Sequence, residues 1–124
     1  MRLSFQAIEN WPLYSNDLAK ISPNVEQQQW LSWQQSNQLY VAIFNQRVVA
    51  YCVLSETDSL LQISRFIVRD VTQRRGIGLF MFQQLLQVTK NRQLTGLQFP
   101  HSNDPVVLSF YQHLGLNNQF IFQL

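Results

Sequence analysis

The chain has 124 residues, of which 46% are hydrophobic and only 13% are charged, and this length fits a single globular domain over residues 1–124. Eighteen glutamines supply much of its polarity, but they occur in short, scattered runs, which argues against a disordered polyglutamine protein. The net charge is +2, and because residues 63–92 carry +5 while the remainder carries −3, the positive charge is local.

The first half of the chain is predicted to contain mostly strands. In chain order we expect an edge strand, two short helices and three further strands, over residues 3–8, 15–21, 24–35, 39–44, 48–54 and 60–68. Residues 15–17 supply N-cap candidates for the first helix. The tryptophans of the second helix, Trp30 and Trp33, are expected either in an aromatic core or facing a ligand or partner.

Strands 39–44 and 48–54 are predicted to form a central antiparallel pair, followed by a third strand. Strands 39–44 and 48–54 are apolar and are joined by polar residues 45–47, which is typical of an antiparallel β-hairpin. In strand 60–68, strict alternation places four side chains on one face, namely Leu61, Ile63, Arg65 and Ile67.

The second half of the chain alternates helices and strands. We expect an amphipathic helix from beyond Gly78 to about residue 90 and then a strand over 94–99. A second helix over 106–114 and a last strand over 119–124 follow. Asp104 and Pro105 suit the start of the second of these helices, and Gly115 suits its end. The fold class predicted from this order is a mixed α/β sheet, mostly antiparallel.

Other features exclude several functional classes. Cys52 lies in an apolar run and is expected to be a buried structural thiol. Together with His101 and His113 it shows no metal-ligand spacing, so no metal site is expected. The first residues do not resemble a signal peptide, and no apolar run approaches about 18 residues, so we expect a cytoplasmic protein without a membrane partner.

The most informative segment is the loop 68–78, between strand 60–68 and the helix that follows. Gly76 and Gly78 lack a Cβ atom, so backbone N–H groups there can approach an anion at the helix N-terminus. Arg74 and Arg75 can add bidentate contacts to phosphate oxygens. The segment predicts a phosphate or oxyanion cradle, while the simpler interpretation is a tight turn between strand and helix.

Two motifs resemble those of the GCN5-related N-acetyltransferase (GNAT) superfamily. Residues 73–78, Gln-Arg-Arg-Gly-Ile-Gly, have its form Gln/Arg-x-x-Gly-x-Gly/Ala, and residues 109–116 resemble its later Phe-Tyr-x-x-x-Gly-Phe segment. The resemblance implies an acyl-CoA N-acyltransferase fold with splayed central strands and a bound acetyl-CoA (coenzyme A). The residues that it implies for the pantetheine arm and the pyrophosphate are Phe66, Ile67, Val68, Thr72, Gln73, Arg74, Arg75, Gly76, Ile77, Gly78 and Leu79.

Within the superfamily, residues 39–47 and 68–78 look like the PanM/PanZ family of maturation factors of aspartate 1-decarboxylase. This resemblance implies an acetyl-CoA sensor that docks on the decarboxylase zymogen, promotes the self-cleavage that creates its pyruvoyl cofactor, and thereby regulates β-alanine and pantothenate synthesis. By position, Asn45 matches an asparagine beside the bound acetyl group. Ile43 departs from an expected arginine on the surface that contacts the partner, and Tyr111 stands where we expect a residue other than tyrosine.

An active N-acetyltransferase is the alternative. In it His101 would be the base and Tyr111 would protonate the leaving thiolate, although strand 60–68, where the superfamily often places a catalytic carboxylate, has no Asp or Glu. A nucleic-acid binder would use the same arginines but lacks interleaved aromatic residues. The sequence therefore predicts an acetyl-CoA-binding regulator whose partner is the decarboxylase zymogen, with no nucleic-acid partner.

Overall fold

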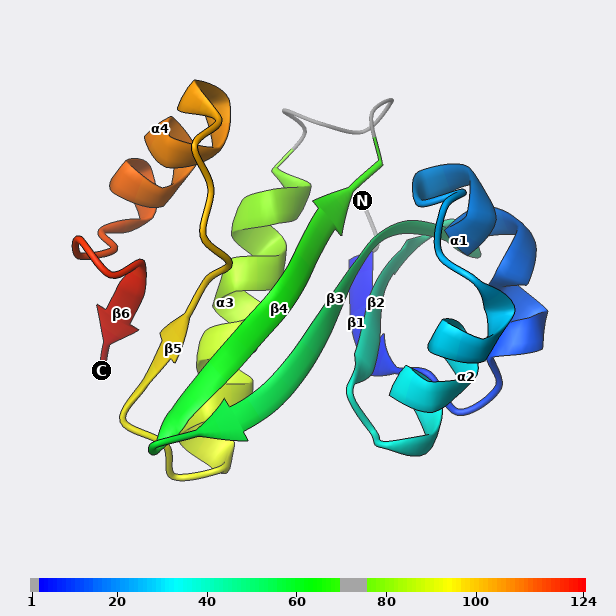
Figure 1. The fold of residues 1–124 in the computed structure, drawn as a ribbon, viewed down its shortest axis with the longest axis horizontal. Helices are drawn as coiled ribbons and strands as arrows, with labels where there is room; N and C mark the ends of the chain where they lie inside the picture. The colour runs from blue at the N-terminus through cyan, green and yellow to red at the C-terminus, as the bar shows by residue number, and fades with distance from the viewer. Residues whose placement is uncertain (1–2, 70–75) are drawn as a thin grey trace.

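The computed structural model describes residues 3–69 and 76–124 as a six-stranded sheet with helices on both faces (Figure 1). The strands follow the order β1-β2-β3-β4-β5-β6, and of the pairs among these described strands only β4–β5 is parallel. The elements are β1 (Leu3–Ala7), the 3₁₀ helix η1 (Trp11–Tyr14), α1 (Ser15–Ile21), α2 (Gln27–Gln35), β2 (Leu39–Phe44), β3 (Arg47–Thr57), β4 (Leu60–Val68), α3 (Ile77–Asn91), β5 (Gly96–Gln98), α4 (Pro105–Leu114) and β6 (Ile121–Gln123). The predicted mixed, mostly antiparallel α/β fold is confirmed.

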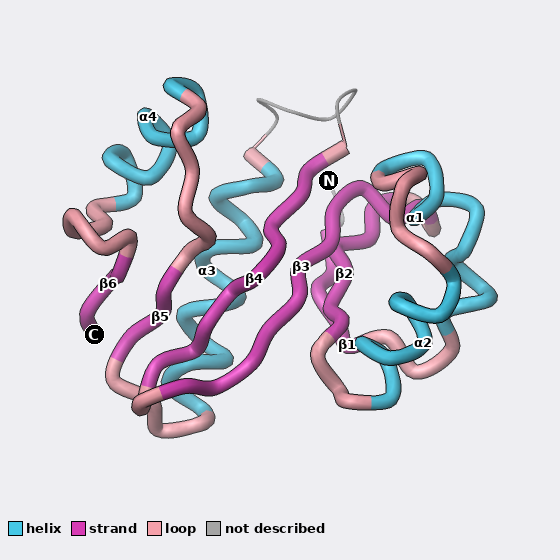
Figure 2. The backbone as a smooth tube through the Cα atoms, in the orientation of Figure 1, coloured by secondary structure: helices cyan, strands magenta, loops and turns pink. Residues whose placement is uncertain are grey.

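The sheet separates two hydrophobic cores, with α3 and α4 on one face and α1 and α2 on the other (Figures 1 and 2). On the α3 side, Met81 and Leu85 pack in the core with Leu61 and Cys52. Cys52 is the buried thiol that was predicted, and burial raises its pKa. No helix in the described residues is long and apolar enough to cross a membrane.

The second core includes both tryptophans of α2, Trp30 buried in it and Trp33 packed against it. Trp30 is 2% exposed, and its ring lies 5.0 Å from the ring of Tyr51 in an edge-on contact. The aromatic-core alternative is therefore confirmed for Trp30. Trp33 is only half-buried and lines a pocket, so the two tryptophans have different surroundings.

The first helix does not use the predicted side-chain caps. Its N-cap residue is Tyr14, which makes no side-chain capping bond. The carboxylate of Asp17 instead accepts hydrogen bonds from Nε and Nη2 of Arg47, at 3.0 and 2.7 Å, and from the N–H of Val48 at 2.9 Å. The bonds from Arg47 lower the pKa of Asp17. The N-cap prediction was wrong because a guanidinium 30 residues away is the stronger partner.

Two tight turns join the central antiparallel strands. Asn45 and Gln46 have φ values of 51° and 66°, and Asp58 and Ser59 have 53° and 67°, which is the left-handed geometry of two-residue hairpin turns. The predicted hairpin is confirmed, although β3 continues to Thr57, three residues beyond its expected end.

A bulge in β4 changes which side chains share a face. Leu54 pairs with Ile63 but Val53 pairs with Arg65, so Ser64 is an extra residue and the alternation resets behind it. Phe66 joins the core on the α3 side, and Arg65 lies over the ring of Trp33 on the α2 side. The prediction that Arg65 shares a face with Leu61 and Ile63 was wrong for this reason.

The second half follows the predicted order, with shorter strands. Asp104 caps α4 by accepting a hydrogen bond from the N–H of Val106 at 2.9 Å, and Gly115 ends it with φ of 89°. Both predicted helix signals are confirmed. Strands β5 and β6 have three residues each, fewer than expected, and α2 begins at Gln27 rather than near residue 24.

Candidate functional site

Strands β4 and β5 diverge after three residue pairs. Leu60–Gln62 pairs with Gly96–Gln98, and from Ile63 to Ile67 the only strand that pairs with β4 among the described residues is β3. Figure 1 shows the chain beyond β5 leaving the direction of β4. The predicted splay of the sheet is therefore confirmed.

A pocket of about 500 Å³ lies at this divergence. One wall comes from β4, a second from the end of β5 and the residues after it, and a third from the turn before β6. In that order, the walls consist of Gln62, Ile63 and Ser64, of Gln98, Phe99, Pro100 and His101, and of Asn118, Gln119 and Phe120. The volume suits one end of a small organic ligand. Sequence reasoning missed Asn118 and Gln119, whose only signal was their polarity at the start of the predicted strand 119–124.

The end of β4 has its side chains engaged in the cores on both sides. The ring of Phe66 lies 5.2 Å from that of Phe99 and 6.1 Å from that of Phe110, whereas Ile67 packs on the α1/α2 side. A ligand beside this part of β4 would therefore meet the backbone of Phe66, Ile67 and Val68.

The N-terminus of α3 has the geometry of an anion site. Gly76 precedes the helix with φ of 80°, a conformation that favours glycine, and a Cβ added there would have no atom within 4 Å. The first intrahelical bond runs from the N–H of Phe80 to the carbonyl of Gly76, at 2.9 Å. The amides of Ile77, Gly78 and Leu79 precede it, and the partial positive charge of a helix lies at such amides.

Gly78 has a different structural role. A Cβ at Gly78 would lie 3.1 Å from Cζ of Phe110, so the missing side chain lets α3 pack closely against α4. Gly78 thus has a packing reason of its own, and the contact of its N–H with a bound anion stays a prediction.

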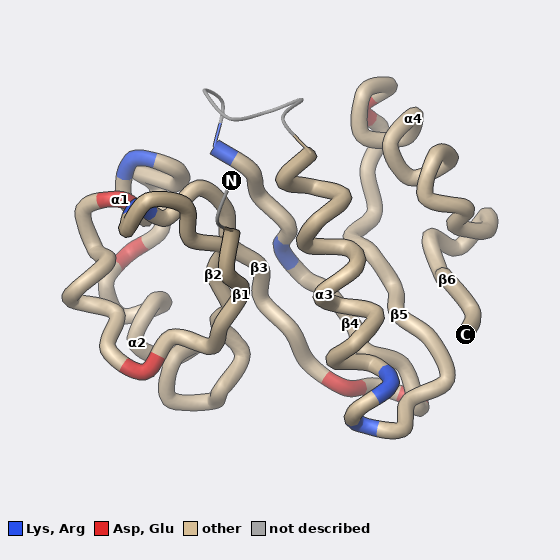
Figure 3. The backbone as a smooth tube through the Cα atoms, turned by 180° about the vertical axis from the view of Figure 1, so that it is seen from behind, with Lys and Arg blue, Asp and Glu red and all other residues tan. Residues whose placement is uncertain are grey.

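The predicted residues Thr72, Gln73, Arg74 and Arg75 lie outside the described residues, so their roles stay predictions. The other basic residues of the stretch 63–92 are not all near this loop. Arg92, just beyond the far end of α3, donates hydrogen bonds to Glu56 at 3.1 Å and to the Tyr40 hydroxyl at 3.0 Å. Figure 3 accordingly shows Lys and Arg at both ends of the sheet.

His101 lines the pocket at the divergence, and Tyr111, which is not part of the lining, packs against the lining residues Phe99 and Phe120. The Tyr111 hydroxyl donates to the carbonyl of Pro100 at 2.8 Å, and its ring lies between those of Phe99 and Phe120, so it supports the pocket wall from behind. Burial raises the pKa of Tyr111 to about 12. His101 is exposed, with its ring 5.4 Å from that of Phe120.

Tyr111→Phe should make stability depend less steeply on pH in the alkaline range. The folded-state pKa of Tyr111 is about 12 against an ordinary value of 10.0, so the unfolded chain loses this proton first and stability falls as pH rises through that interval. Thermal unfolding of the wild type and Tyr111→Phe between pH 9 and 12 measures the difference. Tyr14→Phe, which leaves Tyr111 in place, should keep the wild-type slope, and parallel curves for all three would contradict the assignment.

Asn45 lies apart from the other predicted site residues. It is exposed in the β2–β3 turn and lines a separate pocket of about 600 Å³ with Leu3, Ser4, Ile43 and Gln46. This pocket shares no residue with the one at the divergence. In the sheet, β3 lies between β4 and strand β2, which ends just before Asn45. The placement of Asn45 beside an acetyl group stays a prediction.

Comparison with known proteins assigns the fold and the family. Residues 9–121 match the family model described as "Acetyltransferase (GNAT) domain, PanZ". The PanD regulatory factor of Escherichia coli K12 is 36% identical over 88 residues, which cover 69% of this chain but only 57% of that protein. The PanD regulatory factor of Salmonella typhimurium LT2 is 28% identical over 123 residues, covering 96% of this chain and 94% of that protein.

A solved structure agrees with the sequence comparisons. The solution NMR structure of YhhK from Escherichia coli bound to coenzyme A superposes with a TM-score of 0.79 at 26% identity, and the match covers 96% of this chain and 94% of that one. Since the family model covers nearly the whole chain, this protein belongs to the PanZ family of GNAT acetyltransferase domains.

Proposed function

We propose that this protein binds acetyl-CoA and, in that state, promotes the self-cleavage of the aspartate 1-decarboxylase (PanD) zymogen to its pyruvoyl form. The observation that carries the proposal is the divergence of β4 from β5 beside the N-terminus of α3, in a chain of the PanZ family. The name PanD regulatory factor, borne by two relatives, supports the partner. The coenzyme A bound to YhhK supports the ligand.

The described residues fit a coenzyme A molecule. Its pantetheine arm carries amide groups, which would pair with the backbone of Phe66, Ile67 and Val68 where β4 has left β5. Its pyrophosphate would lie at the α3 N-terminus, where N–H groups and the helix dipole favour an anion. The residues proposed for the pyrophosphate are Thr72, Gln73, Arg74, Arg75, Gly76, Ile77, Gly78 and Leu79.

The pocket chemistry supports a regulator over a transferase. Transfer of an acetyl group to an amine needs a base to deprotonate the incoming ammonium and often an acid for the thiolate. The described lining of the pocket includes no Asp or Glu, so His101 is the only ordinary base candidate in it. The Tyr111 proton is already donated to the carbonyl of Pro100, which makes it a poor acid for the thiolate.

Control by acetyl-CoA requires that the ligand favour the docked state. A ligand shifts an equilibrium only by its difference in affinity between the two states. The acetyl end would therefore either form part of the surface that contacts the zymogen or order that surface. Both cases predict that acetyl-CoA strengthens the complex.

Co-expression with the PanD zymogen of the same organism tests the proposal. We expect the cleaved fraction, measured by mass spectrometry of the decarboxylase chains, to rise from a minor to a major species. A complex should also appear on size exclusion when acetyl-CoA is added. Unchanged cleavage with no complex would refute the regulatory role, and turnover of acetyl-CoA with amines that is lost in His101→Ala would favour the transferase.

A further inference from the structure

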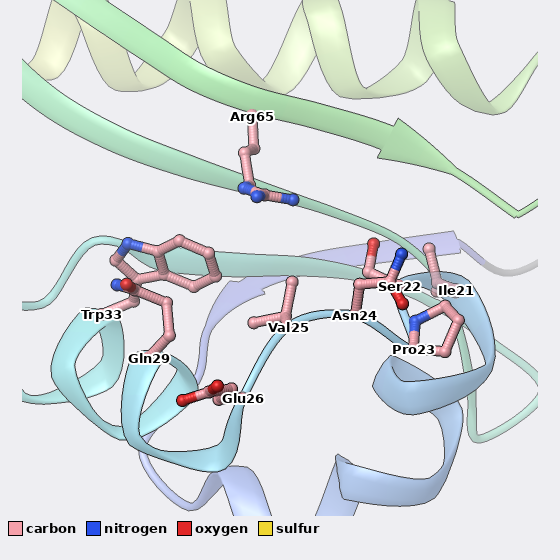
Figure 4. Close-up of a pocket in the computed structure, with 9 residues that line it drawn as sticks. All are labelled: Ile21, Ser22, Pro23, Asn24, Val25, Glu26, Gln29, Trp33 and Arg65. Carbon is pink, nitrogen blue, oxygen red and sulfur yellow. The ribbon is translucent and has the colours of Figure 1, made fainter.

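A third pocket, of about 610 Å³, lies on the opposite side of β4 from Phe66. It is enclosed by the connection between α1 and α2, the first turns of α2 and one side chain of β4, and Figure 4 shows its lining of Ile21, Ser22, Pro23, Asn24, Val25, Glu26, Gln29, Trp33 and Arg65. It shares no residue with the pocket at the β4–β5 divergence. A role for it is therefore separate from the coenzyme A site proposed above.

Arg65 is held in place in this pocket by two contacts. Its guanidinium carbon lies 5.3 Å from the centre of the Trp33 ring, and Nη1 donates to the Tyr51 hydroxyl at 3.2 Å. That hydroxyl is hydrogen bonded in turn to Oγ of Ser22 at 2.9 Å. Figure 4 shows the side chain reaching from β4 into the space between Trp33 and the residues around Ser22. The guanidinium is thus oriented before any ligand arrives.

Arg65 forms no ion pair with any residue in the described ranges 3–69 and 76–124. Among the described residues the ion pairs are Arg47 with Asp17 and Arg92 with Glu56, both outside this pocket. Glu26 also lines the pocket, but it is exposed, and Figure 4 shows it on the far side of Val25 from the guanidinium. Within the described part of the chain, this half-buried guanidinium uses Nη1 for the Tyr51 hydroxyl and has no carboxylate partner. A guanidinium can bind a carboxylate with two parallel hydrogen bonds, so a carboxylate ligand matches it.

The remaining lining limits the rest of the ligand. Ile21, Val25 and the part of the Trp33 ring that Arg65 does not cover offer apolar surface, which suits a short aliphatic body. Glu26 would repel a second negative charge at the rim. We propose that this pocket binds a small monocarboxylate, with its carboxylate on Arg65 and its aliphatic part against Val25 and Trp33.

An NMR titration of the full chain with butyrate tests this proposal. Saturable shifts are expected at the Trp33 indole N–H and the Arg65 Nε–H, with none on titration with butyramide, which has the same shape but no charge. Succinate should bind more weakly than butyrate in the wild type, and Glu26→Gln should remove that difference.

Variants of Arg65 distinguish specific binding of the carboxylate by this side chain from nonspecific attraction of an anion to a positively charged protein. Arg65→Lys keeps the charge without the planar fork and should weaken butyrate binding by about tenfold, while Arg65→Gln should weaken it further. Lys90→Gln, which removes one positive charge at the end of α3, should leave the affinity unchanged. Equal binding of butyrate and butyramide, shifts that do not saturate, or unchanged affinity in a folded Arg65→Gln protein would overturn the proposal.

Discussion

Gly76→Asp should weaken acetyl-CoA binding by about a hundredfold compared with Gly76→Asn, because it places a carboxylate where the pyrophosphate would lie. Gly76 has φ of 80°, a conformation that Asn and Asp tolerate better than other residues with side chains, and a Cβ there has no neighbour within 4 Å. The two variants have nearly the same shape and differ by one negative charge. Isothermal titration calorimetry with acetyl-CoA measures the difference.

The same pair of variants separates binding from folding. A carboxylate at a helix N-terminus stabilises the helix, so Gly76→Asp should unfold at a temperature equal to or above that of Gly76→Asn. Lost affinity in a protein of undiminished stability would then reflect repulsion of the diphosphate. Equal dissociation constants in the two variants would mean that the anion does not bind at the start of α3.

Local signals were enough to predict much of this fold. The cap at Asp104, the helix end at Gly115 and the hairpin turn at Asn45 depend on conformations and bonds within a few residues, and all three are found in the structure. The turn before α3 is equally local, because its left-handed conformation requires only that a glycine, here Gly76, stand at that position. Such features can be predicted from one sequence because the residues that determine them are close together in it.

The features that could not be predicted depend on distant partners. Asp17 bonds to Arg47 instead of capping its own helix, and Tyr111 bonds to the carbonyl of Pro100 rather than presenting a free hydroxyl. The bulge at Ser64 has no sequence signature, yet it decides that Arg65 faces α2. The pocket around Arg65 follows from that one extra residue, since an unbroken alternation would have turned Arg65 toward α3.

Gly96→Ala should be among the most destabilising single changes in this chain. Gly96 pairs with Leu60 on β4 and with Gln123 on β6, and an added Cβ would lie 2.5 Å from the backbone carbonyl oxygen of Phe122. A backbone atom cannot move aside as a flexible side chain can, so β6 must shift. We expect the free energy of unfolding to fall by about 2–3 kcal/mol, and the melting temperature by roughly 10 °C.

Gly115→Ala is the matched control, because a Cβ at Gly115 would also have Phe122 as its neighbour but at 3.9 Å. Gly115→Ala should lower the free energy of unfolding by about 1 kcal/mol, because the only strain comes from placing alanine at a φ of 89°. Denaturant titrations that show equal losses for the two variants would contradict the steric argument. Since β5 leads into Phe99 and Pro100 of the pocket wall, a displaced β5–β6 pair should also weaken acetyl-CoA binding, and Gly115→Ala should weaken it less at a temperature where both variants are folded.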